Sequence, residues 1–211
     1  MKPNFDKLLI SARYWLLGMS QTDAAYFKVS EALEYALLHH NGQRNGGDHE
    51  FIHQLGIFHN LRTLHNHIQN PVNVYILAFL HDVVEDKNVP LEEIERLFGS
   101  EIKHKVDLLS KEVLGQKKVD YNLSEAFNDI DTSVVKTADR INNVSSMVGV
   151  FKQPRLLRYY NETKDIFFPL IKAARRNFPS QEPVYENFKL QLVNQLVLVD
   201  KLLNFMPDES K

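Results

Sequence analysis

The sequence contains no cysteine. Disulfide bonds and thiolate chemistry are therefore excluded, and any bound metal must be held by histidine and carboxylate side chains. Such ligands suit harder or borderline ions, among them Mn²⁺, Fe²⁺ and Zn²⁺. An excess of charge of one sign is also lacking, because the formal net charge of the 211 residues is −2 and acidic and basic residues are interspersed. This composition provides no basic face of the kind that binds duplex DNA or an anionic membrane.

Long hydrophobic runs are missing as well. No stretch reaches the roughly 18 to 20 apolar residues that cross a membrane, and the apolar patch from Leu8 to Leu17 is interrupted by Ser11 and Arg13. No clear small-residue cleavage site follows this patch. We therefore expect an amphipathic helix that packs on the body of the protein, not a signal peptide, and a cytoplasmic location.

The dominant periodicity of the chain is helical, with apolar residues recurring three and four positions apart. The predicted helices are residues 26–40, 51–68, 72–86, 90–98, 100–114, 122–129, 131–150, 154–177 and 184–205. Residues 115–122 form a loop between them, and no convincing strand is present. The pattern predicts an all-α, single-domain protein of about eight to ten helices over residues 1–211. In it the helix at 184–205 either closes the core or forms a dimer interface.

The stretch "LAFLHDVVEDK", residues 77–87, places a histidine and several carboxylates after an apolar run. On a continuous helix, residues four apart share a face, so His81 would lie over Glu85 and Asp82 over Asp86. The apolar run is typical of a buried helix. Buried charges without partners cost several kcal/mol, so this cluster needs a cation or strong partners. Alternatively, the acids lie at the solvent end of the helix and His81 is a core histidine with its hydrogen bonds satisfied.

Two further segments favour the first interpretation. In "VVKTADRINN", residues 134–143, an apolar approach again leads to polar groups, with Asp139 and Asn143 one turn apart on one face. His53 begins an apolar helix directly after the polar, glycine-rich segment "NGQRNGGD", residues 41–48. The chain thus offers imidazole and carboxylate groups in three separate segments.

The order of His53, the His81-Asp82 pair and Asp139 resembles the H…HD…D signature of the HD phosphohydrolase superfamily. "AFLHDVVEDK", residues 78–87, is similar to the hydrolase domain of the RelA/SpoT alarmone enzymes, in which an acidic pair follows the HD pair. "KTADRINNVSSM" (136–147) and "NETKDIFFPLIKAA" (161–174) resemble two further segments of that domain. "QRNGGDHEFIH" (43–53) resembles its loop before the first metal histidine. The resemblance covers roughly residues 26–175 and implies the helical HD-domain fold.

For the metal site, the resemblance implies one Mn²⁺ per chain, or another divalent ion, with the ligands His53, His81, Asp82 and Asp139. Glu85 and Asp86 would be the catalytic acids that position or activate the attacking water. This agrees with the chemistry of the residue types, because a bound divalent ion lowers the pKa of water and a neighbouring carboxyl group can take or return its proton.

For the substrate, the resemblance implies contacts from Arg44, Asn143 and Ser146. Arg44 is planar and charged at every working pH, so it can stack on a base or grip phosphate, and the family pattern assigns it to the guanine base. Asn143 would form a hydrogen bond with substrate or water. Ser146 would offer its hydroxyl group to the substrate.

The chain departs from the family pattern around this substrate pocket. The family usually has Pro and Tyr where this chain has His49 and Glu50, and Pro where it has Gln54. Lys87 replaces a small hydroxyl residue. Ser145 and Ser146 stand where the family commonly has an Arg-Thr pair, so that arginine contact is lost. None of these positions is a metal ligand.

The function that the resemblance implies is hydrolysis of the 3′-pyrophosphate of ppGpp or pppGpp to GDP or GTP and pyrophosphate. Few residues follow the matching region, so we expect a small alarmone hydrolase without a synthetase. One alternative keeps the metal chemistry and changes the substrate to another nucleotide, as in NADPH phosphatases, or to a pyrophosphorylated tRNA end, with tRNA or a cognate toxin as partner. Another is a non-catalytic, nucleotide-sensing HD module. The oligomeric state stays open.

Overall fold

The computed structural model of the chain describes residues 4–43 and 47–205. Its α-helices are α1 (Phe5–Ser20), α2 (Tyr26–His39), α3 (Ile52–Arg62), α4 (Pro71–Leu80), α5 (Val83–Lys87), α6 (Leu91–Phe98), α7 (Ser100–Leu109), α8 (Leu123–Ala126), α9 (Ile130–Met147), α10 (Gln153–Glu162), α11 (Phe168–Asn177) and α12 (Glu182–Phe205). Short 3-10 turns lie at His65–His67 and Pro179–Gln181, and a π-helical turn, Thr163–Phe167, joins α10 to α11. The prediction of an all-α fold is confirmed. None of the helices described is both long and apolar enough to cross a membrane.

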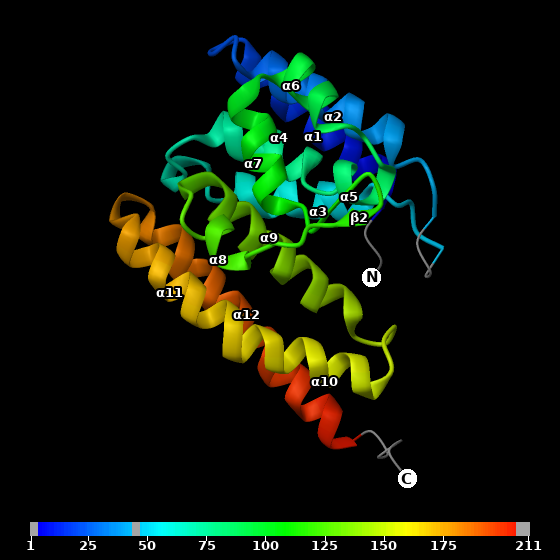
Figure 1. Cartoon of the computed structure of the whole chain (residues 1–211), viewed down its shortest axis with the longest axis vertical. Coiled ribbons are helices and arrows are strands. Elements are labelled where there is room, and N and C mark those ends of the chain that lie inside the picture. The colour runs from blue at the N-terminus through cyan, green and yellow to red at the C-terminus, as the bar shows by residue number, and fades with distance from the viewer. Residues whose placement is uncertain (1–3, 44–46, 206–211) are drawn as a thin grey trace.

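The helices form a body and an elongated layer. Figure 1 shows α1 to α7 gathered in the body, while α10, α11 and α12 run along one side of the molecule. Helix α9 lies between the two and packs against α3 and α4 in the body and against α12 in the layer. Residues on different faces of α9 therefore belong to the core and to the site described below.

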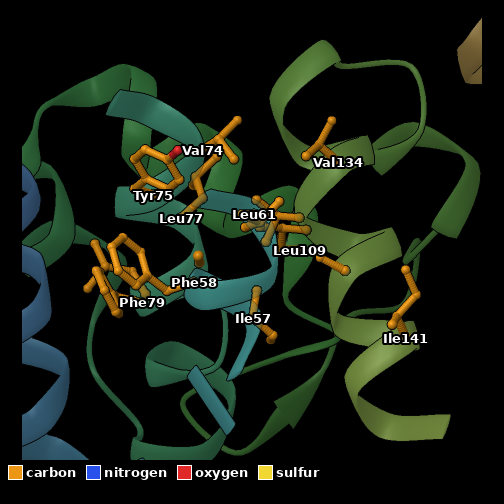
Figure 2. Close-up of a cluster of buried hydrophobic side chains, with 14 of the residues drawn as sticks. Ile57, Phe58, Leu61, Val74, Tyr75, Leu77, Phe79, Leu109, Val134 and Ile141 are labelled. Atoms are coloured by element: carbon orange, nitrogen blue, oxygen red, sulfur yellow. The ribbon is translucent and has the colours of Figure 1, made fainter. Parts of the chain in front are cut away.

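The core of the body is built from α3, α4 and α9. Figure 2 shows side chains of these three helices meeting in one cluster, with Leu109 at the end of α7 beside them. Every residue of α4 from Val74 to Leu80 is buried, as its apolar sequence predicts. Burial of α4 on all sides places the residue that follows it, His81, in the interior as well.

The predicted single helix over residues 72–86 is wrong. Helix α4 ends at Leu80 and α5 begins at Val83, so His81 and Asp82 lie in a turn between two helices. Consecutive residues of a continuous α-helix point about 100° apart, because one turn takes 3.6 residues. The break changes that direction, so the side chains of His81 and Asp82 face the same point. A continuous helix, with His81 stacked over Glu85, would point them apart.

The expectation that the chain has no strand is also wrong, in one short segment. The predicted helix over 100–114 ends at Leu109, and β1 (Glu112–Val113) then pairs with β2 (Gln116–Lys117) in an antiparallel hairpin. The two turn residues, Leu114 and Gly115, have φ values of 51° and 73°. Positive φ at both positions is the backbone of the two-residue turn that matches the twist of a hairpin. Leucine rarely adopts a positive φ, so the sequence offered little indication of this hairpin turn.

Candidate metal centre

Two buried histidines present their Nε2 atoms to one point. His53 lies in the first turn of α3, and its Nδ1 is 2.7 Å from Oδ1 of Asn142 on α9. His81 follows the last residue of α4, and its Nδ1 is 3.0 Å from the carbonyl oxygen of Ala78. Because both partners are oxygen acceptors, each Nδ1 carries a proton, and loss of the second ring proton leaves the lone pair on Nε2. This is the tautomer that a metal ligand needs.

Two aspartates complete the cluster. Oδ2 of Asp82 lies 2.9 Å from Nε2 of His81 and 3.5 Å from Nε2 of His53. Oδ1 of Asp139, on α9, lies 3.1 Å and 3.9 Å from the Nε2 atoms of His53 and His81 respectively. Ligand atoms of His53, His81 and Asp82 all lie within 4.8 Å of one another.

The donor set fits a divalent cation. Beyond its approach to Asp82, the buried Nε2 of His81 has no hydrogen-bond partner among the residues that the structure describes. A buried polar atom left in this way points to a missing partner. Imidazole nitrogens with carboxylate oxygens suit Mn²⁺, Fe²⁺ or Zn²⁺. The structure thus brings together the four residues that the sequence predicts as ligands, from α3, from the α4–α5 turn and from α9.

The charges of the cluster are strongly coupled. Burial opposes ionisation of Asp139, but the hydrogen bond with His53 and the charge of Lys136 lower its pKa to about 2. Burial likewise opposes ionisation of Asp82, and His81 holds the pKa of this carboxyl group below its usual range. For His81 itself, burial lowers the pKa, and the two aspartates more than offset this and raise it to about 9. The metal-free cluster therefore holds a proton on His81 that a bound cation would displace.

The two predicted catalytic acids lie on the short helix α5. Oε2 of Glu85 accepts a hydrogen bond of 2.9 Å from the backbone N–H of Lys111, just before the hairpin. Desolvation and the negative charges of Asp82 and Glu85 raise the pKa of Asp86 to about 6. A carboxyl group with a pKa close to neutrality can both accept and return a proton.

Of the three predicted substrate-binding residues, the structure describes Asn143 and Ser146. Arg44 lies outside the described residues. The side-chain amide of Asn143 donates a hydrogen bond of 2.6 Å to Oδ1 of Asp139, so this residue contacts a candidate ligand. The hydroxyl group of Ser146 is exposed and donates to the carbonyl oxygen of Asn143, 3.1 Å away.

Comparisons with known proteins agree with these features. The chain is 31% identical over 176 residues to the GTP pyrophosphokinase rsh of Brucella ovis, covering 79% of this chain and 22% of that protein. It is 32% identical over 165 residues (72% and 21%) to a probable guanosine-3′,5′-bis(diphosphate) 3′-pyrophosphohydrolase of Synechocystis sp., and 30% identical over 200 residues (90% and 26%) to the guanosine-3′,5′-bis(diphosphate) 3′-pyrophosphohydrolase of Spiroplasma citri. The chain thus spans less than a third of the length of these relatives. No protein-family model matches it.

Among solved structures, the chain is similar to that of a metazoan orthologue of SpoT, a protein described as hydrolysing ppGpp and playing a role in starvation responses. The TM-score is 0.57 at 21% sequence identity, over 81% of this chain and 94% of that one. The chain therefore shares the helical fold of that protein. Together with the sequence relatives, this fold confirms the resemblance to the RelA/SpoT-type hydrolase domain.

Sequence reasoning missed Asn142, whose Oδ1 lies 2.7 Å from Nδ1 of His53. A Cβ atom added to Gly56 of α3 would lie 2.4 Å from the side-chain nitrogen of Asn142. The glycine therefore lets α3 and α9 approach closely enough for Asn142 to reach His53. A signal was present, because Asn142 follows Asp139 by three residues and so shares its helix face.

Lys136 and Tyr121 were also missed. Nζ of the buried Lys136 lies 3.9 Å from Oδ2 of Asp139 and donates to the carbonyl oxygen of Leu109, 3.3 Å away. The hydroxyl group of Tyr121 is buried without a hydrogen-bond partner among the described residues. Burial and the charges of Glu85 and Asp139 raise the pKa of Tyr121, while the charge of Lys136 lowers it. No local spacing relates Tyr121 to the motifs.

Proposed function

We propose that the chain hydrolyses the 3′-pyrophosphate of ppGpp and pppGpp with one Mn²⁺ per chain. The observation that carries this proposal is the convergence of two imidazole nitrogens, oriented by Asn142 and Ala78, with two carboxylates. It is supported by the SpoT-type fold and by relatives that are named for this reaction.

His53, His81, Asp82 and Asp139 would hold the ion. When bound, a divalent ion supplies positive charge that polarises phosphoryl oxygens and lowers the pKa of water. Lys136 offsets part of the negative charge of Asp139, 3.9 Å away. Asn142 and Asn143 hold one ligand each, which keeps the donor atoms oriented.

Asp86 and Glu85 would handle the attacking water. Asp86 accepts a proton from the water, whose oxygen forms a bond to the phosphorus atom next to the ribose 3′ oxygen. The bond between that phosphorus and the 3′ oxygen breaks, and the proton reaches the 3′ oxygen. One water molecule is consumed, and GDP or GTP and pyrophosphate are released. Glu85, held by the N–H of Lys111, positions the water.

We assign Arg44 and Ser146 to contacts with the nucleotide. Asn143 already donates to Asp139, so we assign it first to holding that ligand. The departures at Glu50, Gln54 and Lys87 change the surroundings of the pocket while all four ligand positions are retained. Another nucleotide or a pyrophosphorylated tRNA end is therefore the alternative that the test must separate.

The test is release of pyrophosphate from ppGpp by Mn²⁺-loaded protein, with EDTA-treated protein as the control and NADPH and GDP as comparison substrates. Metal-dependent formation of GDP would support the proposal. If the protein binds the metal but does not turn over ppGpp, the proposed substrate is wrong and the proposed metal site is unaffected. The double variant His81→Ala, Asp82→Ala should be inactive, whereas a nucleotide-sensing module would keep its function in that variant.

A further inference from the structure

Three of the positions where this chain departs from the RelA/SpoT pattern lie together in space. Nζ of Lys87 donates to both carboxylate oxygens of Glu50, at 2.7 Å each. Nδ1 of His40 lies 3.7 Å from Oε1 of Glu50, and Nε2 of His40 lies 3.5 Å from Nε2 of Gln54. These residues come from the end of α2, the segment before α3, α3 itself and the end of α5. The departures at Glu50, Gln54 and Lys87 therefore belong to one cluster of side chains, which His40 connects.

The Glu50–Lys87 ion pair is partly shielded from solvent. The two side chains are 25% and 23% exposed, and the neighbouring His40 and Gln54 are almost fully buried. The backbone N–H of Glu50 also donates to the carbonyl oxygen of Gly42, 2.9 Å away. A charge-assisted pair in which one ammonium group reaches both oxygens, and which is shielded from water, is stronger than a typical surface pair.

The pair joins two elements that carry different parts of the candidate site. Glu50 stands two residues before the start of α3, which carries His53 in its first turn. Lys87 is the last residue of α5, which carries Glu85 and Asp86. The ion pair therefore links the segment that leads into a metal ligand to the helix of the two acids.

Helix α5 depends on such external contacts. It has five residues, and Asn88, the residue that follows it, has a φ of 53°. Isolated helices shorter than about 12–15 residues are marginal in water, so neighbouring elements must set the orientation of α5. One tether is the hydrogen bond from the Lys111 N–H to Glu85. The Glu50–Lys87 pair is a second tether. It holds the residue that directly follows Glu85 and Asp86 in the chain.

We propose that Glu50 and Lys87 are positioning residues, whose ion pair fixes α5 so that Glu85 and Asp86 meet water and substrate at a set place relative to the metal ligands. This inference rests on the proposed function only for its kinetic consequence. Glu50 stands where the family has Tyr, and Lys87 where it has a small hydroxyl residue. The two replacements then belong together, because each charge neutralises the other. The pair acts through Glu85 and Asp86 and does not itself touch the reacting atoms.

The kinetic test uses Glu50→Gln, Lys87→Gln and the double variant, all assayed with Mn²⁺ well below their unfolding temperatures. A small misplacement of reacting groups costs on the order of 100-fold in rate, so each single variant should lower kcat by about 10- to 100-fold. The double variant should lose no more than either single one, because the two changes remove one interaction. Mn²⁺ affinity and KM should stay close to those of the unchanged protein. The charge-swapped variant Glu50→Lys, Lys87→Glu should recover most of the lost kcat.

A matched control is the ion pair between Arg13 of α1 and Glu34 of α2. It has two contacts of 2.7 Å, like the Glu50–Lys87 pair, but its side chains are about half exposed and it joins α1 to α2. Glu34→Gln should leave kcat unchanged. Equal kcat in Glu50→Gln and Glu34→Gln, or losses in the two single variants that simply add in the double variant, would overturn the positioning role.

A second readout needs no substrate and separates this inference from the proposed function. Hydrogen exchange of the backbone amides in residues 83–88 of Mn²⁺-loaded protein should be faster in Glu50→Gln and Lys87→Gln than in Glu34→Gln. If the unchanged protein does not turn over ppGpp, the proposed function fails, and the exchange result alone decides the inference. Unchanged exchange in residues 83–88 would refute it.

Discussion

Two aspartates on the same helix, α9, show how differently a buried carboxylate can be accommodated. Asp131, near the start of the helix, is completely buried and accepts hydrogen bonds from Lys105, Asn70 and Asn73, at 2.5, 3.0 and 3.2 Å. Asp139, further along, faces the Nε2 atoms of two histidines. Its partner His81 keeps a buried nitrogen without a hydrogen bond among the described residues.

The difference lies in where the positive charge comes from. At Asp131 the chain supplies it, because the ammonium group of Lys105 lies against the carboxylate. At Asp139 Lys136 lies further away, at 3.9 Å, and in the metal-free protein a proton on His81 supplies the remaining positive charge, which a bound cation would replace. A buried charge is therefore evidence for a ligand only where its surroundings leave polar atoms without partners. The predictions below test this distinction.

The largest effect is expected from Asp139→Asn. Losing a hydrogen bond that only orients a ligand costs about 10- to 100-fold in metal affinity or activity, so losing a ligand should cost more than about 100-fold. Mn²⁺ affinity by calorimetry and pyrophosphate release measure it. Asp131→Asn is the control and should keep both properties in the folded protein. Equal Mn²⁺ affinity in the two variants would contradict the distinction.

Lys105→Met should have the opposite profile. Removing one partner of a buried ion pair costs about 3–5 kcal/mol, because Asp131 would be left charged and buried with only the two asparagines. The free energy of unfolding in urea should fall by that amount. Mn²⁺ affinity of the folded variant should not change. A stability close to that of the unchanged protein would show that Asp131 is not held as a structural charge.

Asn142→Ala should have an intermediate effect on the metal site. The imidazole of His53 would lose the acceptor that fixes its tautomer and orientation, 2.7 Å from Nδ1. Mn²⁺ affinity should fall by about 10- to 100-fold. Ser145→Ala is the matched control, since this exposed hydroxyl group donates to the backbone carbonyl oxygen of Asn142. If both variants bind Mn²⁺ like the unchanged protein, His53 does not need its second contact.

The smallest effect, at most about tenfold for each pH unit, is the pH dependence of metal binding. Because the pKa of His81 is raised to about 9 in the metal-free protein, a proton competes with the cation below that pH. Mn²⁺ affinity should rise by up to about tenfold per pH unit from pH 7 and level off near pH 9. In the metal-free protein the same shift stabilises the folded state fully below pH 6.5, and this stabilisation is lost as the pH rises through 9. Affinity independent of pH over this range would contradict the protonated cluster.

Much of the site could be predicted from the sequence because it lies next to strong local signals. The apolar residues before His81 predict a buried helix, and α4 is buried on every side. The residue types and their order predict the four groups that converge. The direction in which adjacent residues point was not predictable, because the break between α4 and α5 depends on how the turn packs against α3 and α9.

Contacts between distant residues were beyond the reach of local patterns. The Glu50–Lys87 pair joins positions that the sequence marks only as two separate departures from the family pattern. Asn142 reaches His53 only because Gly56 leaves room between two helices. The β1–β2 hairpin forms around a leucine with positive φ, which turn preferences do not favour.

The sequence by itself determined the helical class of this protein, the absence of thiolate ligands and the set of imidazole and carboxylate groups available to a metal. Periodicity and residue chemistry are local properties, so they can be read along the chain. Only the tertiary structure decided which buried carboxylate lies against a lysine ammonium group and which one lies beside the Nε2 atoms of two histidines. That decision depends on Lys105, in α7, and His81, in the turn between α4 and α5, reaching α9, and such packing is a property of the folded chain as a whole.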